Sequence, residues 1–258
     1  MIEHFFKIDP RLLDVADAAL GDCRAPFEAI DETAEYNACK VLAAFIDNRV
    51  SESHFTGTTG YGYGDRGRDT LDAVLAQIMG TEEALIRHNF VSGTHAITTA
   101  LFGVLRPGDR MVSLTGAPYD TLQPVIGIVP GGHGSLREFG IQYEQLDLRA
   151  DGAPDYENVA KAVRGARVAY IQRSRGYTLR ESLHIDEISR LIDAVRAADP
   201  DTVVIVDNCY GEFVEKCEPT QAGADLIVGS LIKNPGGGIA KTGGYIAGRA
   251  DLIELCAC

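Results

Sequence analysis

Short apolar runs alternate with helix-periodic segments from about residue 69 onward, and this alternation constrains the fold more than any other feature of the chain. Apolar residues recur at positions i, i+3, i+4 and i+7 in sets that begin at Leu71, Ile97 and Tyr156, and each set marks one face of a helix. Strands that are apolar throughout suit a parallel sheet covered on both faces. The sequence therefore predicts an α/β fold, a mainly parallel sheet sandwiched by helices. The runs expected as strands are Ala84–Ile86, Met111–Leu114, Val168–Ile171, Val203–Val206 and Leu226–Val228.

The same patterns divide the chain into three parts. Helical periodicity over residues 10–20 and 33–50, followed by a Gly-, Thr- and Ser-rich stretch, predicts N-terminal helices and an arm over residues 1–60. Residues 61–248 form the main domain. Residues 249–258 have the pattern of a helix without a stop signal, and we expect that helix to lead into a C-terminal small domain that is missing from this sequence.

The acidic composition limits the partners that the chain can bind. It carries 37 Asp and Glu against 24 Lys and Arg, a formal net charge of −13, and has no basic cluster. Nucleic acids and anionic membranes are bound chiefly through clustered Lys and Arg, so neither is an expected partner. Charged residues within positions 1–10 interrupt any signal-peptide core, which favours a cytoplasmic protein. The six cysteines lack zinc-site spacing, so we expect free thiols and no metal.

A small turn follows the first predicted strand and precedes the helix of residues 97–104. Ser92, Gly93 and Thr94 form this turn, which would free backbone N–H groups at a helix N-terminus and so favour a phosphate. An ordinary capped turn is the alternative. Tyr119, in a turn after the next strand, is either a ligand contact or a core aromatic.

Two charged residues follow buried strands further along the chain. Asp207 ends the run of residues 203–206, where a carboxylate is costly unless a cation or several donors meet it. Lys233 follows the strand of residues 226–228 and precedes three glycines, and an apolar setting of this kind can make a lysine a nucleophile. Ser230 lies close enough in sequence to reach the same ligand. A helix-capping aspartate and a surface lysine are the alternatives.

Taken together, these places resemble the fold type I enzymes that use pyridoxal 5′-phosphate (PLP), in their Cys/Met-metabolism branch. Four segments are similar to the subgroup of aluminium-resistance or methionine γ-lyase-like proteins: Tyr61-Gly-Tyr-Gly-Asp-Arg-Gly-Arg-Asp-Thr-Leu, Val91-Ser-Gly-Thr-His-Ala-Ile, Gln172-Arg-Ser-Arg-Gly-Tyr and Lys233-Asn-Pro-Gly-Gly-Gly-Ile-Ala. The resemblance implies that residues 61–248 are the large domain of the PLP-dependent transferase fold.

The resemblance also implies a role for each candidate residue. Lys233 would bind PLP covalently and then move the Cα proton of the substrate, and Asp207 would keep the pyridine nitrogen protonated. Tyr119 would stack on the ring and complete the catalytic set. The phosphate would be bound by the turn Ser92, Gly93 and Thr94, by the hydroxyl of Ser230, and by Tyr63 and Arg66 from the neighbouring subunit.

The activity implied is that of a carbon–sulfur lyase acting on a sulfur-containing amino acid, by β- or γ-elimination, as in cystathionine β-lyase or methionine γ-lyase. Another PLP-dependent transformation of an amino acid, transsulfuration or an aminotransferase-like step, stays open. An inactive PLP-binding fragment stays open as well, because the family's substrate-carboxylate arginine lies in the C-terminal domain. The expected partners are the amino-acid substrate and copies of the same chain in a homodimer or homotetramer.

Overall fold

A seven-stranded sheet forms the centre of the molecule in the computed structural model, which describes residues 2–58, 61, 64–129 and 133–257. The strand order is β1-β7-β6-β5-β4-β2-β3. Within the described sheet only β7 runs opposite to the other strands, pairing antiparallel with both β1 and β6. The predicted α/β class and mainly parallel sheet are thereby confirmed. The strands are β1 (Glu83–Arg87), β2 (Arg110–Ser113), β3 (Gln142–Gln145), β4 (Val168–Gln172), β5 (Val203–Asp207), β6 (Leu226–Ser230) and β7 (Gly244–Gly248).

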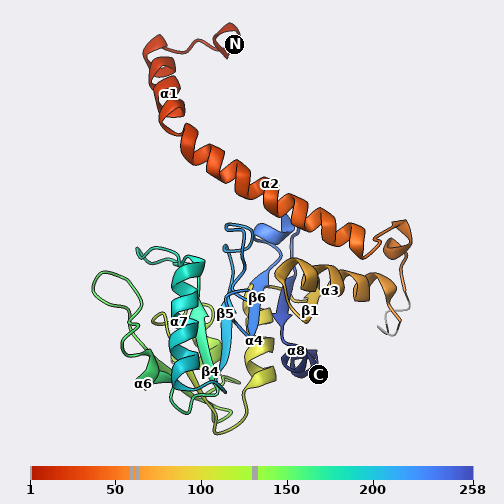
Figure 1. Cartoon of the computed structure of the whole chain (residues 1–258), viewed down its shortest axis with the longest axis vertical. Coiled ribbons are helices and arrows are strands. Elements are labelled where there is room, and N and C mark those ends of the chain that lie inside the picture. The colour runs from red at the N-terminus through yellow and green to blue at the C-terminus, as the bar shows by residue number, and fades with distance from the viewer. Residues whose placement is uncertain (1, 59–60, 62–63, 130–132, 258) are drawn as a thin grey trace.

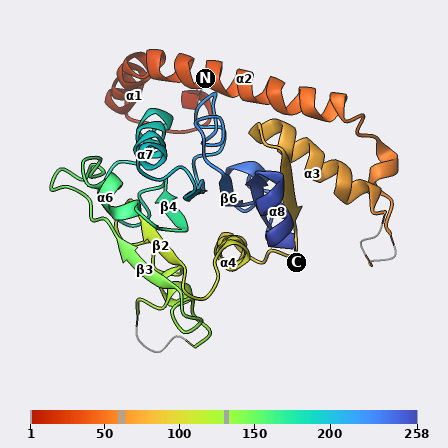
Figure 2. The same cartoon turned by 60° about the horizontal axis from the view of Figure 1, so that its bottom comes forward.

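Helices cover both faces of this sheet (Figures 1 and 2). One face carries α3 (Arg66–Met79), α6 (Val159–Val163) and α7 (Ile185–Ala198). The other face carries α4 (Gly93–Val104), α5 (Gln123–Ile126) and α8 (Ala250–Ala257). The sheet therefore lies between two helical layers, which is why its central strands are apolar along their whole length.

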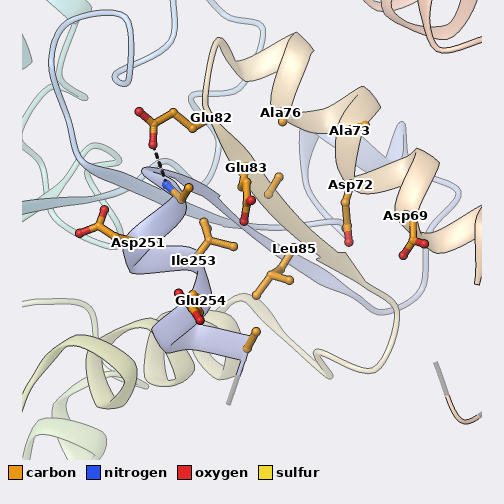
Figure 3. Close-up of a pocket in the computed structure, with 13 residues that line it drawn as sticks. Asp69, Asp72, Ala73, Ala76, Glu82, Glu83, Leu85, Asp251, Ile253 and Glu254 are labelled. Carbon is orange, nitrogen blue, oxygen red and sulfur yellow. Dashed lines mark hydrogen bonds between the residues drawn. The ribbon is translucent and has the colours of Figure 1, made fainter. Parts of the chain in front are cut away.

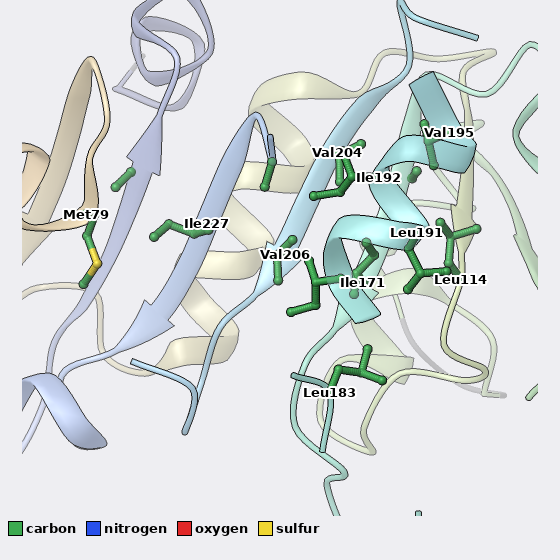
Figure 4. Close-up of a cluster of buried hydrophobic side chains, with 14 of the residues drawn as sticks. Met79, Leu114, Ile171, Leu183, Leu191, Ile192, Val195, Val204, Val206 and Ile227 are labelled. Atoms are coloured by element: carbon green, nitrogen blue, oxygen red, sulfur yellow. The ribbon is translucent and has the colours of Figure 1, made fainter. Parts of the chain in front are cut away.

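The core divides into two layers because successive side chains of a strand point to opposite faces. In β5, Val204 and Val206 belong to the cluster beneath α7, whereas Val203 and Ile205 belong to the cluster beneath α4. Figure 4 shows the α7 layer, where Leu191 and other apolar residues of the helix face the strands. All of these side chains are almost fully buried.

Of the N-terminal helices, α1 (Pro10–Asp22) extends away from this body, whereas α2 (Arg24–Asp47) runs across it and packs against α3 (Figure 1). Only Asn37 and Ala44 of the two helices are buried, and many apolar side chains are left exposed: Leu12, Val15, Leu20, Phe27, Ile30, Leu42 and Ile46. Short 3-10 turns span Ile2–His4, Glu52–Phe55 and Asn234–Gly236. Within the described residues, none of the helices combines the length and the hydropathy that crossing a membrane requires.

The sequence patterns do not predict β3, β7, α5 or α7. β3 has the polar sequence Gln-Tyr-Glu-Gln at an exposed sheet edge, and β7 is bounded by glycines, so neither presents a long apolar run. α7 was omitted although Ile188, Leu191, Ile192 and Val195 have helical spacing. The helix expected to start near Tyr156 is shorter, beginning at Val159 after a turn.

Candidate active site

A cavity of about 240 Å³ lies at the sheet edge where the parallel strands end. Its lining comes from the turns that follow β1, β2, β4, β5 and β6, which is the usual position of a ligand in an open α/β sheet. The structure thus brings together seven of the residues singled out in the sequence: Ser92, Gly93, Thr94, Tyr119, Asp207, Ser230 and Lys233.

Asp207 is the last residue of β5, and its carboxyl group is 2% exposed. Oδ1 accepts a hydrogen bond from the backbone N–H of Cys209 at 3.1 Å, and Oδ2 accepts one from the Tyr170 hydroxyl at 3.3 Å. Burial raises the pKa of Asp207 above its ordinary value, and the nearby Lys233 opposes that shift only weakly. A buried carboxylate with so few donors favours a cationic or protonated group in the adjacent cavity.

The turn before α4 has the form of an anion site. Ser92 is the N-cap of α4, and its side chain accepts a hydrogen bond from the His95 N–H at 3.1 Å. The first N–H groups of the helix, those of Gly93 and Thr94, have no acceptor within the helix. A Cβ atom on Gly93 would lie 3.0 Å from the Cβ of Ser230, so the close approach of α4 to the end of β6 requires glycine here.

Tyr119 is held between two neighbouring turns. Its backbone N–H donates to Oε1 of Gln172 at 2.8 Å, and its hydroxyl lies 3.0 Å from Oγ1 of Thr94. Burial, together with the nearby charge of Asp207, raises the pKa of Tyr119, so the phenol stays protonated. The Gln172 amide also donates to the Ser174 carbonyl at 3.0 Å, which fixes the segment that follows β4.

Lys233 lies in a tight turn directly after β6. Its backbone N–H donates to the carbonyl of Ser230 at 3.3 Å, and the 3-10 turn of residues 234–236 follows at once. A Cβ on Gly236 would lie only 1.7 Å from the carbonyl oxygen of Leu231, so no side chain fits there. The ammonium group of Lys233 donates to the hydroxyl of Tyr210 and lies 4.0 Å from the centroid of that ring.

A buried polar cluster supports the turn after Asp207. Asn208 accepts a hydrogen bond from Nη1 of Arg173 at 2.9 Å and donates to Oε2 of Glu218 at 2.9 Å. Arg173 also donates to the Gly211 carbonyl at 2.8 Å and pairs with Glu215 at 2.6 Å. These bonds fix the turn from its inner side, and the sequence analysis did not identify them.

Glu212 lies in the same buried region and is fully inaccessible to solvent. Its Oε1 accepts a hydrogen bond from the Tyr245 hydroxyl at 2.8 Å, and within the described residues Oε2 has no hydrogen-bond partner. Burial raises the pKa of Glu212 to about 8. Its backbone carbonyl accepts a bond from the side chain of Asn234 at 2.9 Å, which connects this turn to the one that carries Lys233.

Two of the predicted cofactor-binding residues come from the segment before α3. Tyr63 lies outside the described residues, and Arg66 does not line the cavity. Arg66 is the first residue of α3, next to its N-cap Asp65, and is exposed. Their predicted contact belongs to a neighbouring subunit and stays a prediction.

A larger cavity of about 750 Å³ lies between α3, β1 and α8 (Figure 3). Its walls combine carboxylates such as Asp69 and Glu83 with the apolar side chains of Leu85 and Ile253, and none of the Lys or Arg residues that the structure describes lines it. An anionic cofactor would meet repulsion there. The smaller cavity is therefore the candidate active site.

Comparison with known proteins identifies the family. The profile described as Methionine gamma-lyase matches residues 12–258. The chain belongs to the methionine gamma-lyase family. The aluminium-resistance or methionine γ-lyase-like resemblance noted in the sequence is confirmed.

Relatives of this methionine gamma-lyase family member are longer than the chain itself. YnbB of Bacillus subtilis is 52% identical over 229 residues, which cover 88% of this chain and 54% of YnbB. The carbon-sulfur lyase involved in aluminum resistance from Clostridium novyi is 51% identical with a TM-score of 0.92, covering 96% of this chain and 60% of that one. L-methionine gamma-lyase of Treponema denticola is 25% identical over 200 residues, which cover 76% of this chain and 45% of that enzyme. The chain thus spans about half the length of the curated relatives it matches.

The cavity of this methionine gamma-lyase family member fits PLP. The buried Asp207 carboxylate would complement a protonated ring nitrogen, and Tyr119 stands beside it as an aromatic wall. At the other end, the α4 N-terminus and the hydroxyl of Ser230 offer donors to a phosphate. Lys233 would supply the amine for a covalent link.

Cys209 and Tyr210 also line this cavity, and the sequence analysis did not identify either of them. Burial raises the pKa of the Cys209 thiol, which keeps it protonated beside Asp207. Both residues directly follow the Asp207–Asn208 pair. A thiol and an aromatic residue after a strand-end carboxylate are the sequence signal by which they could have been identified.

Proposed function

We propose that this chain carries the cofactor site of a PLP-dependent carbon–sulfur lyase. The single observation that supports this most strongly is the buried Asp207 carboxylate, which lines one cavity together with Lys233 and the N-terminus of α4. The substrate would be a sulfur-containing amino acid. Its elimination would consume one water and release a thiol, ammonia and a 2-oxo acid. When bound, the cofactor supplies an electron sink for the carbanion formed at the substrate Cα.

Each of the cavity residues would have its own role in binding the cofactor or in moving a proton. Lys233 Nζ accepts the Cα proton of the substrate and returns a proton later in the reaction. Asp207 holds a proton on the ring nitrogen, and the N–H groups of Gly93 and Thr94 with the hydroxyl of Ser230 bind the phosphate. Tyr119 covers the ring and excludes water from one side.

We further propose that the active form is a homodimer or homotetramer in the cytoplasm. The exposed apolar side chains of α1 and α2 support self-association, because a second copy would remove them from water. In such an assembly Tyr63 and Arg66 would reach the phosphate of the neighbouring subunit.

Reductive trapping tests the cofactor site. The 258-residue chain is mixed with PLP, reduced with borohydride, digested and analysed by mass spectrometry. We expect the label on Lys233, its loss in Lys233→Ala, and its retention in the matched variant Lys241→Ala, since Lys241 does not line the cavity. Label on other lysines with none on Lys233 would contradict the proposed site.

A substrate screen tests the reaction. PLP-loaded protein is incubated with methionine, homocysteine, cysteine and cystathionine. The release of 2-oxo acid is measured together with that of a thiol or, from homocysteine and cysteine, of hydrogen sulfide. Release of a 2-oxo acid with four carbons indicates γ-elimination, whereas release of one with three carbons indicates β-elimination. Trapping of PLP on Lys233 without any release would instead favour a protein that binds the cofactor without turnover.

A further inference from the structure

Tyr210 has an unusual backbone conformation at the mouth of the candidate active site. Its φ is +68°, and in the described residues only Arg49 and Phe213 share a positive φ among residues other than glycine. Aromatic residues rarely adopt this left-handed conformation, and where they do the surrounding structure must impose it.

The surrounding structure does impose this conformation. The N–H of Gly211 donates to the carbonyl of Asn208 at 2.8 Å, and the Gly211 carbonyl accepts from the buried Arg173 at 2.8 Å. A Cβ on Gly211 would lie 2.4 Å from Cδ of Arg173, so the turn is closed tightly against that side chain. Tyr210 is thereby fixed in place from both sides.

The fixed turn places the Tyr210 side chain against Lys233. The ammonium nitrogen lies 4.0 Å from the centroid of the ring and donates to the phenol oxygen. The ring is 57% exposed, so burial of apolar surface is not what fixes its position. A cation above an aromatic face is attracted by the electrons of the ring, and the hydroxyl adds a directed bond.

We propose that Tyr210 is a positioning residue that holds the Lys233 nitrogen at the cavity mouth. After the ammonium group gives up a proton to solvent, this nitrogen bonds to the carbon of an aldehyde ligand, and the aldehyde oxygen leaves as water. The inference rests on the proposed function, because PLP is the aldehyde that the cavity fits. The side chain of Asn234 donates to the Glu212 carbonyl at 2.9 Å, so the turns that carry Tyr210 and Lys233 are tied to each other. The strained turn therefore sets the position of the amine before any ligand arrives.

Nuclear magnetic resonance tests the contact without PLP. Lysines are reductively methylated with ¹³C-formaldehyde, and the Lys233 signal is assigned by its loss in Lys233→Arg. Methyl groups on an amine that lies over the face of an aromatic ring have an upfield ring-current shift, and the Lys233 amine lies over the ring of Tyr210. We expect this shift in the wild type and in Tyr210→Phe, and its loss in Tyr210→Leu. The matched control is Tyr36→Leu, which removes the ring beneath Lys216 and leaves the Lys233 signal unchanged.

The rate of PLP capture tests the consequence. With equimolar PLP, borohydride trapping on Lys233 should be about tenfold slower in Tyr210→Leu, intermediate in Tyr210→Phe and unchanged in Tyr36→Leu. Tyr210→Gly relieves the backbone strain, so it should melt no lower than the wild type and yet capture PLP as slowly as Tyr210→Leu.

Two results would overturn the inference: an unshifted Lys233 signal in the wild type, or trapping in Tyr210→Gly at the wild-type rate. A wild type that shows the ring-current shift but captures no PLP on Lys233 overturns the proposed function and, with it, the role in aldehyde capture.

Discussion

The carboxyl group of Asp207 is buried, and its hydrogen-bond donors are the backbone N–H and the thiol of Cys209 and the hydroxyl of Tyr170. Without PLP, its raised pKa means that the native state holds the proton over a pH range in which the unfolded chain has lost it. This difference lowers the free energy of unfolding as pH rises above about 4 toward the raised pKa of the native state.

We therefore expect Asp207→Asn to separate stability from function. The PLP-free variant should be at least as stable as the wild type at pH 8 in urea unfolding, since it carries no charge to desolvate. It should nevertheless bind PLP more weakly and lose most of any turnover, because the ring nitrogen is no longer held protonated. Near-normal turnover would show that Asp207 is only a residue of the turn and has no role in the reaction.

Glu212 provides a second test of the buried charges. Its pKa of about 8 predicts that the free energy of unfolding falls by an amount on the order of a few kcal/mol between pH 4.5 and pH 8. Above pH 8 this contribution is constant. Glu212→Gln removes this dependence. The free energy of unfolding of the variant, relative to that of the wild type, should therefore be higher at pH 9 than at pH 5. Equal pH dependence in the two proteins, measured by urea unfolding, would show that Glu212 is ionised in the native state.

Asp207 and Lys233 could be identified from the sequence, because burying a charge after an apolar strand costs free energy and therefore indicates a functional role. The sequence places the aromatic Tyr210 soon after Asp207, but it does not show where the side chains of Tyr210 and Glu212 lie. Their positions depend on a turn with positive φ and on the packing of Arg173 beneath it, and neither leaves a regular spacing in the sequence.

At the scale of elements, the turn after β6 depends on the absence of a side chain at one position. Gly236→Ala would place a Cβ 1.7 Å from the Leu231 carbonyl oxygen, so the turn must open and displace Lys233. We expect a lower melting temperature and a loss of PLP trapping on Lys233. Gly21→Ala in α1 is the matched control, since nothing lies within 4 Å of the new Cβ, and it should stabilise that helix by up to ~1 kcal/mol. Trapping at the wild-type level in Gly236→Ala would refute this account of the turn.

The sheet was predictable where its strands are buried on both faces, as β4, β5 and β6 are. β3 was not predictable, because it has the polar pattern of a solvated sheet edge. β7 was not predictable either, because glycines bound its short apolar centre. The antiparallel insertion of β7 between β1 and β6 is a long-range property of the topology that no local pattern encodes.

At the scale of the whole molecule, the exposed apolar side chains of α1 and α2 bear on the proposed assembly. A double substitution, Leu20→Glu with Ile30→Glu, places charges where a second copy would pack, so sedimentation should show a smaller species than the wild type forms. Ala25→Glu adds a charge to an exposed position of α2 that carries no large apolar side chain and is the control. An unchanged assembly in the double variant would exclude this surface from the interface.

The insertion of β7 beside β1 has a consequence for synthesis on the ribosome. β1 is made early, yet its hydrogen-bonding partner is the much later strand β7, and Glu83 pairs with Gly248. Until β7 has been made, the backbone of β1 on that side is unpaired, and contacts this distant in sequence form slowly. The nascent chain therefore has the turn before α4 early, but this turn is held in place only after β7 has emerged. A ribosome stalled before residue 244 should accordingly present residues 83–104 as a protease-sensitive segment.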